Sequence, residues 1–323
     1  MNLSIVVPVW NDPQGLASLL KRIAELRIFN QVVVVDDASD LDCDPSSLGF
    51  TGESIGATLL YLRSAKQAGA GAARNLGLER VTSEHVIFFD ADDLLDDAFP
   101  DVWELHRGAT GDACPDFTMF RHADNRVESN EGRRGSFLPE EHLWDLALAG
   151  RDVAGLGDSQ KSLLAQTINY PWNKIYRTAF LRKEGIRCSE TVVHNDILLH
   201  WESFLLATRI IGAQHIVATG KGHLTHRASQ DRFCVFGVLG HVVLRLRESQ
   251  YYQAFLVGFV RFVIRVLRWN LGVVEERLRE DFTKSIRAFF VGVLGEELNL
   301  FSLASPVEAE SLGEFLNGWR QSF

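Results

Sequence analysis

The sequence places an acidic cluster, Asp90-Ala91-Asp92-Asp93, directly after an apolar run over residues 85–89. If the pleat of a strand continues into this cluster, Asp90 and Asp92 project to the same side at the edge of a sheet. Such a pair suits Mg²⁺ or Mn²⁺, which typically take one or two carboxylates from a protein and their other ligands from water and substrate phosphates. The alternative is an acidic turn that caps a helix beginning near Asp97.

Two other segments contain residues that suit a nucleotide. Asp36 and Asp37 follow an apolar run, so one carboxylate is expected to face inward while its neighbour faces a cleft, where it could accept a hydrogen bond from a ribose or base. In the segment 69–75, glycines allow close approach of a ligand, and the helix that follows offers free N–H groups. Arg74 adds a fixed cation suited to phosphate. For Asp36 and Asp37 the alternative is an ordinary turn.

The elements that must position these residues follow a β-α-β-β-α-β pattern. Continuous apolar runs rich in β-branched residues predict parallel strands that are covered on both faces. The expected strands are residues 3–8, 31–35, 58–62 and the run that ends at Asp90, with helices from Pro13 and over 72–80. This order predicts an α/β fold with a mainly parallel sheet flanked by helices, and a ligand site at the carboxyl edge of the strands.

The pattern after residue 114 is weaker. It indicates a strand at 116–121, a hairpin or mobile loop over 121–135, a helix at 139–149, a flexible connection at 150–157, a helix at 195–207 and a strand at 210–218. From residue 233 onward the pattern is almost wholly helical. We therefore expect a domain change near residue 230, with a sheet-containing domain over 1–230 and a helical C-terminal extension over 231–323.

Composition limits the class of protein. A chain of 323 residues with 46% apolar residues describes a soluble globular protein of one large or two ordinary domains. A net charge of −9 gives no overall basic footprint for nucleic acid. The four cysteines form no Cys-x-x-Cys pair, the N-terminus lacks a basic leader, and no uncharged apolar stretch is long enough to span a membrane. We expect a cytoplasmic protein with reduced thiols.

One stretch of the helical extension is amphipathic. Val257, Val260, Ile264, Leu267 and Leu271 recur at helical spacing, and Arg261, Arg265 and Arg268 occupy another face. One interpretation is a helix that packs on the rest of the protein with a solvated basic face. The other is a helix that lies in the plane of a membrane, which would make the protein peripheral at the inner face.

Four motifs together resemble those of a known family. Their order, spacing and content are similar to the successive motifs of glycosyltransferase family 2: Ser-Ile-Val-Val-Pro-Val-Trp-Asn at 4–11, Val-Val-Asp-Asp-Ala-Ser at 34–39, Ala-Ala-Arg-Asn-Leu-Gly at 72–77 and Phe-Phe-Asp-Ala-Asp-Asp at 88–93. The segments 172–177 and 184–187 resemble the region before the acceptor-side acid of this family, and Asn195-Asp196 falls where that acid is expected. The resemblance covers about residues 2–230.

The resemblance implies an inverting glycosyltransferase with a GT-A fold. Such an enzyme moves a sugar from a nucleotide-diphosphate donor, preferably a UDP-sugar, to a hydroxyl of a glycan or glycolipid, with Mn²⁺ or Mg²⁺ as cofactor. By matching positions, Asp92 would ligate the metal and Asp196 would be the catalytic base. Glu202, on the same predicted helix as Asp196, is the next candidate for the base. The nucleotide-binding residues implied in the same way are Pro8, Val9, Asn11, Asp37, Gly69, Arg74, Asp90 and Ala91.

The sequence departs from the family pattern at two places. Lys66-Gln67-Ala68-Gly69 replaces the Asn-x-Gly often found before the Ala-Arg-Asn motif, and Asn195 stands where family members commonly carry Glu. His223, His226 and Arg227 lie roughly where some members place residues that reach the diphosphate or the metal.

Two alternatives to an active transferase follow from the sequence. One is a nucleotide-sugar-binding protein that has lost transfer and serves in sensing or as a scaffold, which Asn195 and the helical extension suggest. The other is a nucleotidyltransferase, but no glycine-rich and basic loop follows the first strand.

Overall fold

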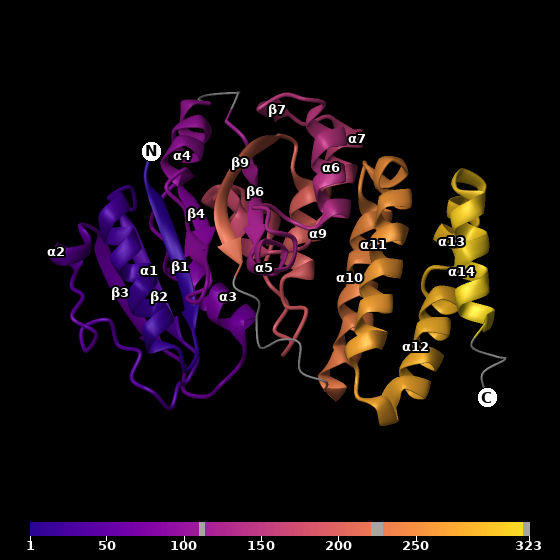
Figure 1. Ribbon diagram of the computed structural model, residues 1–323, viewed down its shortest axis with the longest axis horizontal. Coiled ribbons are helices and arrows are strands. Elements are labelled where there is room, and N and C mark those ends of the chain that lie inside the picture. Colours follow the sequence, from indigo (N-terminus) through magenta and orange to yellow (C-terminus); the bar gives the residue numbers. More distant parts are fainter. Residues whose placement is uncertain (110–113, 221–228, 319–323) are drawn as a thin grey trace.

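The computed structural model describes residues 1–109, 114–220 and 229–318, and it has a twisted sheet with helices on both faces (Figure 1). Four parallel strands form its N-terminal half, in the order β3-β2-β1-β4. They are β1 (Leu3–Val9), β2 (Gln31–Asp36), β3 (Thr58–Arg63) and β4 (His85–Phe88). Every residue of β1, β2 and β4 is buried, as the continuous apolar runs predict.

Beyond β4 the sheet becomes mixed, because β8 joins it antiparallel to β4. β6 follows antiparallel to β8, and β9 is parallel to β6. Two short strands, β5 and β7, pair antiparallel with β9. These elements are β5 (Leu94–Leu95), β6 (Phe117–Asp124), β7 (Val153–Gly155), β8 (Lys174–Arg177) and β9 (Ile210–Gly220).

The helices of the N-terminal half are α1 (Pro13–Leu26), α2 (Gly52–Ile55), α3 (Ala70–Arg80) and α4 (Phe99–Gly108). The α1 helix begins as predicted, since the carboxylate of Asp12 accepts a hydrogen bond from Gly15 N at 2.9 Å and Pro13 follows it. The α3 helix lies very close to the sheet at Gly77, where an added Cβ atom would overlap the side chain of Val6. This close packing fixes the start of α3 near the carboxyl ends of the strands.

Two expectations for the middle of the chain are wrong. The segment expected to be a hairpin or mobile loop continues β6 to Asp124 and then forms the helix α5 (Asn125–Glu131), because Asp124 caps its start and Gly132 ends it in the left-handed region. The segment expected to be a flexible connection contains β7, which gains ladder hydrogen bonds to β9. The remaining helices here are α6 (Leu138–Leu148), α7 (Asp158–Leu164), α8 (Thr178–Glu184) and α9 (Ile197–Leu206).

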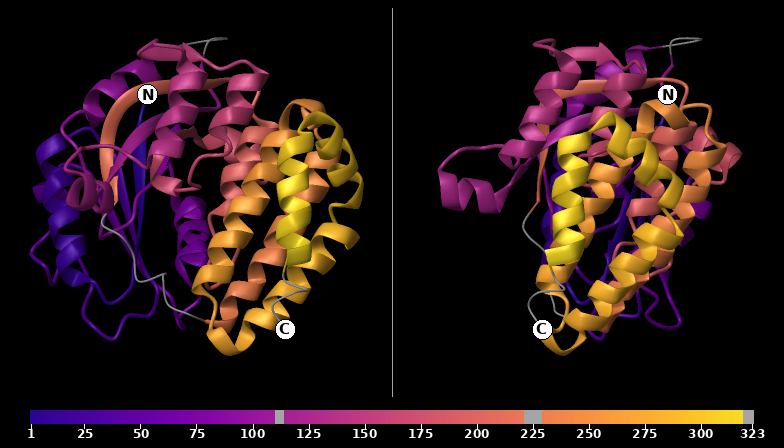
Figure 2. Two further views of the ribbon diagram at one scale, coloured as in Figure 1. Left: turned by 45° about the vertical axis from the view of Figure 1, so that its right-hand side comes forward. Right: turned by 90° about the vertical axis from the view of Figure 1, so that its right-hand side faces the viewer.

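The C-terminal helices lie together beside the sheet (Figure 2). They are α10 (Cys234–Glu248), α11 (Tyr252–Val273), α12 (Arg279–Gly292), α13 (Gly295–Ala304) and α14 (Pro306–Gly318). One apolar core includes buried residues of α9, α10, α11 and α12; the Trp201 ring of α9, for example, packs edge-on against Phe259 of α11 with 4.9 Å between ring centroids. The domain boundary near residue 230 therefore stays a prediction, since the two parts share a core.

The basic face of α11 contacts other parts of the chain. Arg261 forms an ion pair with Glu308 of α14, with 2.5 Å between Nη2 and Oε1, and Arg265 donates a hydrogen bond to the carbonyl of Gln166. These contacts favour the interpretation in which α11 packs on the rest of the protein. Within the described parts of the chain, no helix has the length and apolar character needed to cross a membrane.

Candidate active site

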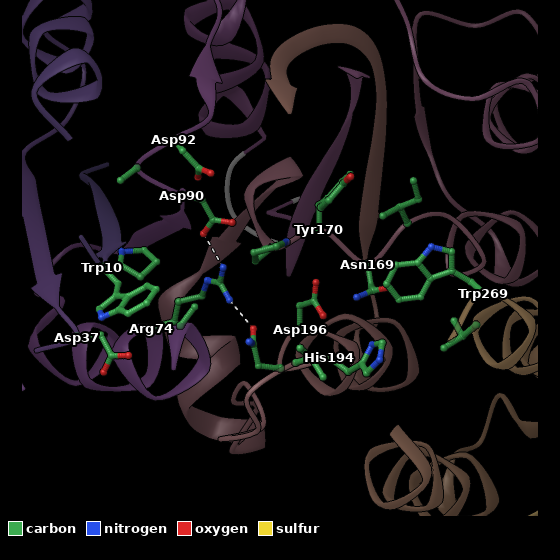
Figure 3. A pocket seen from close by; sticks show the side chains of 18 of the residues that line it. Trp10, Asp37, Arg74, Asp90, Asp92, Asn169, Tyr170, His194, Asp196 and Trp269 are labelled. Carbon is green, nitrogen blue, oxygen red and sulfur yellow. Dashed lines mark hydrogen bonds and ion pairs between the residues drawn. The ribbon is translucent and has the colours of Figure 1, made fainter. Parts of the chain in front are cut away.

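A pocket of about 870 Å³ opens at the carboxyl ends of β1, β2 and β4 (Figure 3). Most of the residues predicted to form a site line it: Pro8, Val9, Asn11, Asp37, Arg74, Asp90, Ala91, Asp92 and Asp196. Gly69 does not line the pocket, but its neighbour Ala70 does. The predicted residues His223, His226 and Arg227 lie outside the described residues.

Arg74 connects the two sides of the pocket. Its buried guanidinium forms an ion pair with Asp90 at the end of β4, with 2.5 Å between Nη2 and Oδ1. The other terminal nitrogen, Nη1, donates to Asn195 Oδ1 at 2.8 Å (Figure 3). A single cation from α3 is thus held between a strand end and the loop that precedes α9, and the side chain at position 195 serves as its neutral acceptor.

The side chains of Asp36 and Asp37 point in different directions, as the strand geometry predicts. Asp36 is fully buried and accepts hydrogen bonds from Tyr61 and Arg63. Asp37 lines the pocket, and its two carboxylate oxygens accept from Ala68 N at 2.8 Å and Gly69 N at 2.7 Å. Gly69 therefore acts on the pocket indirectly, through the loop that Asp37 holds, and its φ of +91° suits glycine.

Asn11 shapes the opposite rim. Its Oδ1 accepts hydrogen bonds from Asp40 N at 2.7 Å and Leu41 N at 3.0 Å, and its own N–H donates to Ser39 Oγ at 2.8 Å. With a φ of +53°, Asn11 occupies the left-handed region, which asparagine tolerates better than most residues. Its amide oxygen thus orders the loop at 39–41 beside the pocket.

The residues present fit a divalent cation. Asp90 and Asp92 line the same pocket, and Asp90 is the one that also pairs with Arg74. Among the described residues, no group of three or more His, Cys, Asp or Glu side chains could hold a metal ion alone. Mg²⁺ and Mn²⁺ do not need such a group when substrate phosphates complete their coordination. The Asp92 carboxylate, together with phosphate oxygens and water, would therefore suit either ion.

The other side of the pocket is built around Asp196, which precedes the first residue of α9 and projects into the middle of the pocket (Figure 3). Removal from water raises the pKa of Asp196, and the nearby Arg74 opposes that rise. A carboxylate with a raised pKa is a stronger proton acceptor. Glu202, the second candidate for the base, is buried against Arg245 of α10 at 2.8 Å and does not line the pocket.

A buried lysine lies behind this part of the pocket. The Nζ atom of Lys174 donates to the carbonyl of Tyr170 at 2.8 Å and to Asn173 Oδ1 at 2.6 Å. Burial lowers the pKa of Lys174 to about 7, against attraction from Asp196 and Glu140. Lys174 therefore holds the chain that carries Tyr170 in place, and the ring of Tyr170 lines the pocket.

The sequence motifs do not contain most of the wall opposite the strand ends. It comes from the region of α5 and α6, the segment 167–171, the short 3-10 helix Gln230–Phe233, and α11. Its aromatic and basic members are Phe137, Tyr170, Phe262, Trp269, Arg126, Arg232 and Arg265. Two of these residues had a signal in the sequence: Arg265 lies on the basic face of the amphipathic stretch, and Tyr170 lies two residues before Trp172 of a recognised motif. In the structure the Tyr170 ring stacks on Trp172 with 4.5 Å between ring centroids. Trp10, at the end of the first motif, also lines the pocket and is 45% exposed.

Two solved structures that share this architecture contain a nucleotide or a nucleotide-sugar. S. aureus TarS 1-349 in complex with UDP aligns with 100% of this chain and 92% of its own, with a TM-score of 0.73 and 18% identity. The mannosyltransferase PcManGT from Pyrobaculum calidifontis, in complex with GDP-Man and Mn²⁺, aligns with 98% of this chain and 84% of its own, with a TM-score of 0.55 and 15% identity. The fold is GT-A, as the motifs imply.

Sequence comparison adds the family. Residues 4–147 match the family model for glycosyl transferase family 2. A cholesterol galactosyltransferase of Borreliella burgdorferi is 23% identical over 296 residues, which are 83% of this chain and 77% of that protein. The chain is a glycosyltransferase, and its residues 4–147 carry the match to family 2.

Proposed function

We propose that the chain transfers a sugar, with inversion, from a nucleotide-diphosphate donor to a hydroxyl of a glycan or glycolipid acceptor, and that the reaction depends on Mn²⁺ or Mg²⁺. The observation that carries this proposal is the Arg74 bridge, which joins the strand end at Asp90 to the loop before Asp196 within one pocket. A UDP-sugar is the preferred donor, since two of the TarS structures with a TM-score of 0.73 are complexes with UDP and with UDP-GlcNAc.

The donor occupies the strand-end side of the pocket. Pro8, Val9 and Asn11 border the nucleoside, with Asp37 and the loop it holds beside the base and Asp90 close to the ribose. The guanidinium of Arg74 supplies positive charge where the diphosphate leaves, and a preorganised charge in a dry pocket stabilises the transition state more than water does. A bound divalent cation, held by Asp92, supplies further positive charge to the diphosphate leaving group.

The acceptor approaches from the side of Asp196. Its hydroxyl attacks the anomeric carbon on the face opposite the diphosphate, so the new C–O bond forms as the bond to the leaving group breaks and the configuration inverts. The proton of the hydroxyl passes to the Asp196 carboxylate, which a hydroxyl can reach at about 3 Å. Tyr170 and Trp269 offer flat aromatic faces against which the apolar face of a sugar can pack.

A thermal-shift screen of nucleotides and nucleotide-sugars, with and without Mn²⁺, tests the donor half of the proposal. A ligand that binds the folded state raises the melting temperature, and we expect the largest rise with a uridine nucleotide plus Mn²⁺. Donors that shift the transition are then incubated with the protein, and release of UDP or of free sugar is measured. A chain that binds no nucleotide-sugar, or that binds one and never cleaves it, contradicts the proposal.

A further inference from the structure

His194, two residues before the proposed base, has a backbone conformation that needs support. Its φ is +61°, a left-handed conformation that non-glycine residues rarely adopt. Such a conformation typically costs about 1–3 kcal/mol and persists only when surrounding contacts hold it. His194, Asn195 and Asp196 all line the pocket, so this turn determines where the Asp196 carboxylate lies.

The support comes from helix α11 of the C-terminal extension. The Nε2 atom of His194 lies 2.7 Å from Asn270 Oδ1. Asn270 is fully buried, and its Nδ2 donates to the carbonyl of Val266 at 2.8 Å, which orients the amide so that Oδ1 accepts from the imidazole N–H. The ring of Trp269 also meets the imidazole edge-on, with 6.0 Å between centroids.

The same loop is held from the opposite side by other elements. Arg74 of α3 donates to the Asn195 side chain at 2.8 Å. Ser189 N donates to the carbonyl of Asn195 at 2.9 Å, and Ser189 Oγ donates to the carbonyl of His194 at 3.3 Å. The loop is thus clamped between the nucleotide side of the pocket and α11.

We propose that Asn270 is a positioning residue for sugar transfer, which acts through the His194 ring to hold Asp196 against the acceptor hydroxyl. The inference rests on the proposed function, and it assigns part of the active site to a helix that carries no family motif. Burial lowers the pKa of His194 to about 4, so the ring stays neutral at physiological pH and keeps the single N–H that Asn270 accepts.

The expected effect is on turnover and not on donor binding. Loss of the Asn270 acceptor frees the His194 ring, and the left-handed turn can then relax toward a commoner conformation. A displacement of about 1 Å in a catalytic group can cost about 10²-fold in rate. Asp37, Asp90 and Asp92 do not depend on this contact, so donor affinity is preserved.

The test compares Asn270→Ala with Asn270→Asp in the full chain. Asn270→Ala should lower kcat for transfer at least tenfold and leave the Kd for UDP with Mn²⁺ within twofold of the wild type. Asn270→Asp keeps an acceptor oxygen for the His194 N–H but loses the donor to the Val266 carbonyl, so it should recover part of that loss. Gln253→Ala, at an exposed amide in the first turn of the same helix, is the control and should match the wild type.

Three results would overturn the inference. They are normal turnover in Asn270→Ala, equal losses in the Ala and Asp variants, and a loss of UDP affinity that parallels the loss of kcat. If Asn270→Ala does not fold, His194→Ala replaces it, because alanine keeps the cost of the positive φ while removing the ring that Asn270 holds. Its turnover should still fall at least tenfold, and normal turnover refutes the role. A wild-type chain that cleaves no nucleotide-sugar would refute the proposed function itself, which these variants do not test.

Discussion

The substitution Gly71→Ala adds a single methyl group at the contact between the two sides of the active site, and it therefore tests whether that contact positions the base. Gly71 lies in the first turn of α3, where an added Cβ atom would overlap the carbonyl oxygen of Ser189 and come within 2.8 Å of Asn195 Cβ. Because ordinary contacts between heavy atoms are about 3.5 Å or longer, Gly71→Ala must push the loop at 189–195 away from α3 by roughly 1 Å. That loop carries Asn195 and leads directly to Asp196.

Gly71→Ala affects both the stability of the fold and the rate of transfer. Overpacking of this kind costs about 1–3 kcal/mol in unfolding free energy, while the better helix propensity of alanine returns about 1 kcal/mol. The net loss of stability should be at most about 2 kcal/mol, so Gly71→Ala remains folded. A shift of about 1 Å in the base should lower kcat by about 10²-fold.

The assay measures kcat by nucleotide release, the Kd for UDP with Mn²⁺ by calorimetry, and the unfolding free energy by urea titration. The control is Gly237→Ala in α10, where an added Cβ atom meets nothing within 4 Å. That variant should gain up to about 1 kcal/mol of stability and keep normal turnover. Normal kcat in a folded Gly71→Ala protein would refute the reasoning, since the base would then tolerate a displaced loop.

Three further variants address individual side chains. Asp196→Asn should lower turnover by about 10²–10⁴-fold while UDP affinity stays near normal, and unchanged turnover means that Asp196 is not the base. Asp92→Ala should weaken Mn²⁺-dependent binding of UDP in calorimetry; equal affinity counts against a metal ligand. Burial raises the pKa of Glu140 from 4.5 to about 8, so between those values the folded state retains a proton that the unfolded state has released, and stability falls as pH rises. This fall in unfolding free energy is at most about 3 kcal/mol between about pH 5 and pH 7, and Glu140→Gln should remove it. Urea titrations at several pH values measure it, and an unchanged dependence of the unfolding free energy on pH would contradict the role of Glu140.

The strand-end half of the site could be predicted because its signals are local. Each strand is a continuous apolar run, and the polar residue that follows it lies at the carboxyl edge whatever the rest of the chain does. Asp196, which the resemblance indicates, also lines the pocket, and its role as the base stays a prediction. The motif did not indicate that the Asp37 carboxylate is already engaged by the N–H groups of Ala68 and Gly69, since that contact depends on the fold of a loop with no periodicity.

The acceptor wall could not be predicted, because it depends on packing between distant segments. Helical spacing identified α11 as amphipathic, yet the same pattern describes a helix on a membrane surface and a helix in a core. Which residues of α11 reach the pocket is decided by the contacts of its buried face with α7, α9 and α10. Asn270 gave no signal at all, since a lone asparagine in an apolar helix has no periodic partner.

Trp201 packs against rings from α11, and the same helix contributes Trp269 and Arg265 to the pocket. Under the proposed function, α11 takes part both in acceptor binding and in the core, so substrate choice and folding are not separable properties in this chain. Redesign for a new acceptor should vary the exposed positions of α11 and leave its inward face untouched. During evolution, each substitution in α11 that favours another acceptor must also preserve the packing of this helix on α9 and α10. This requirement limits which series of substitutions can lead to a new acceptor.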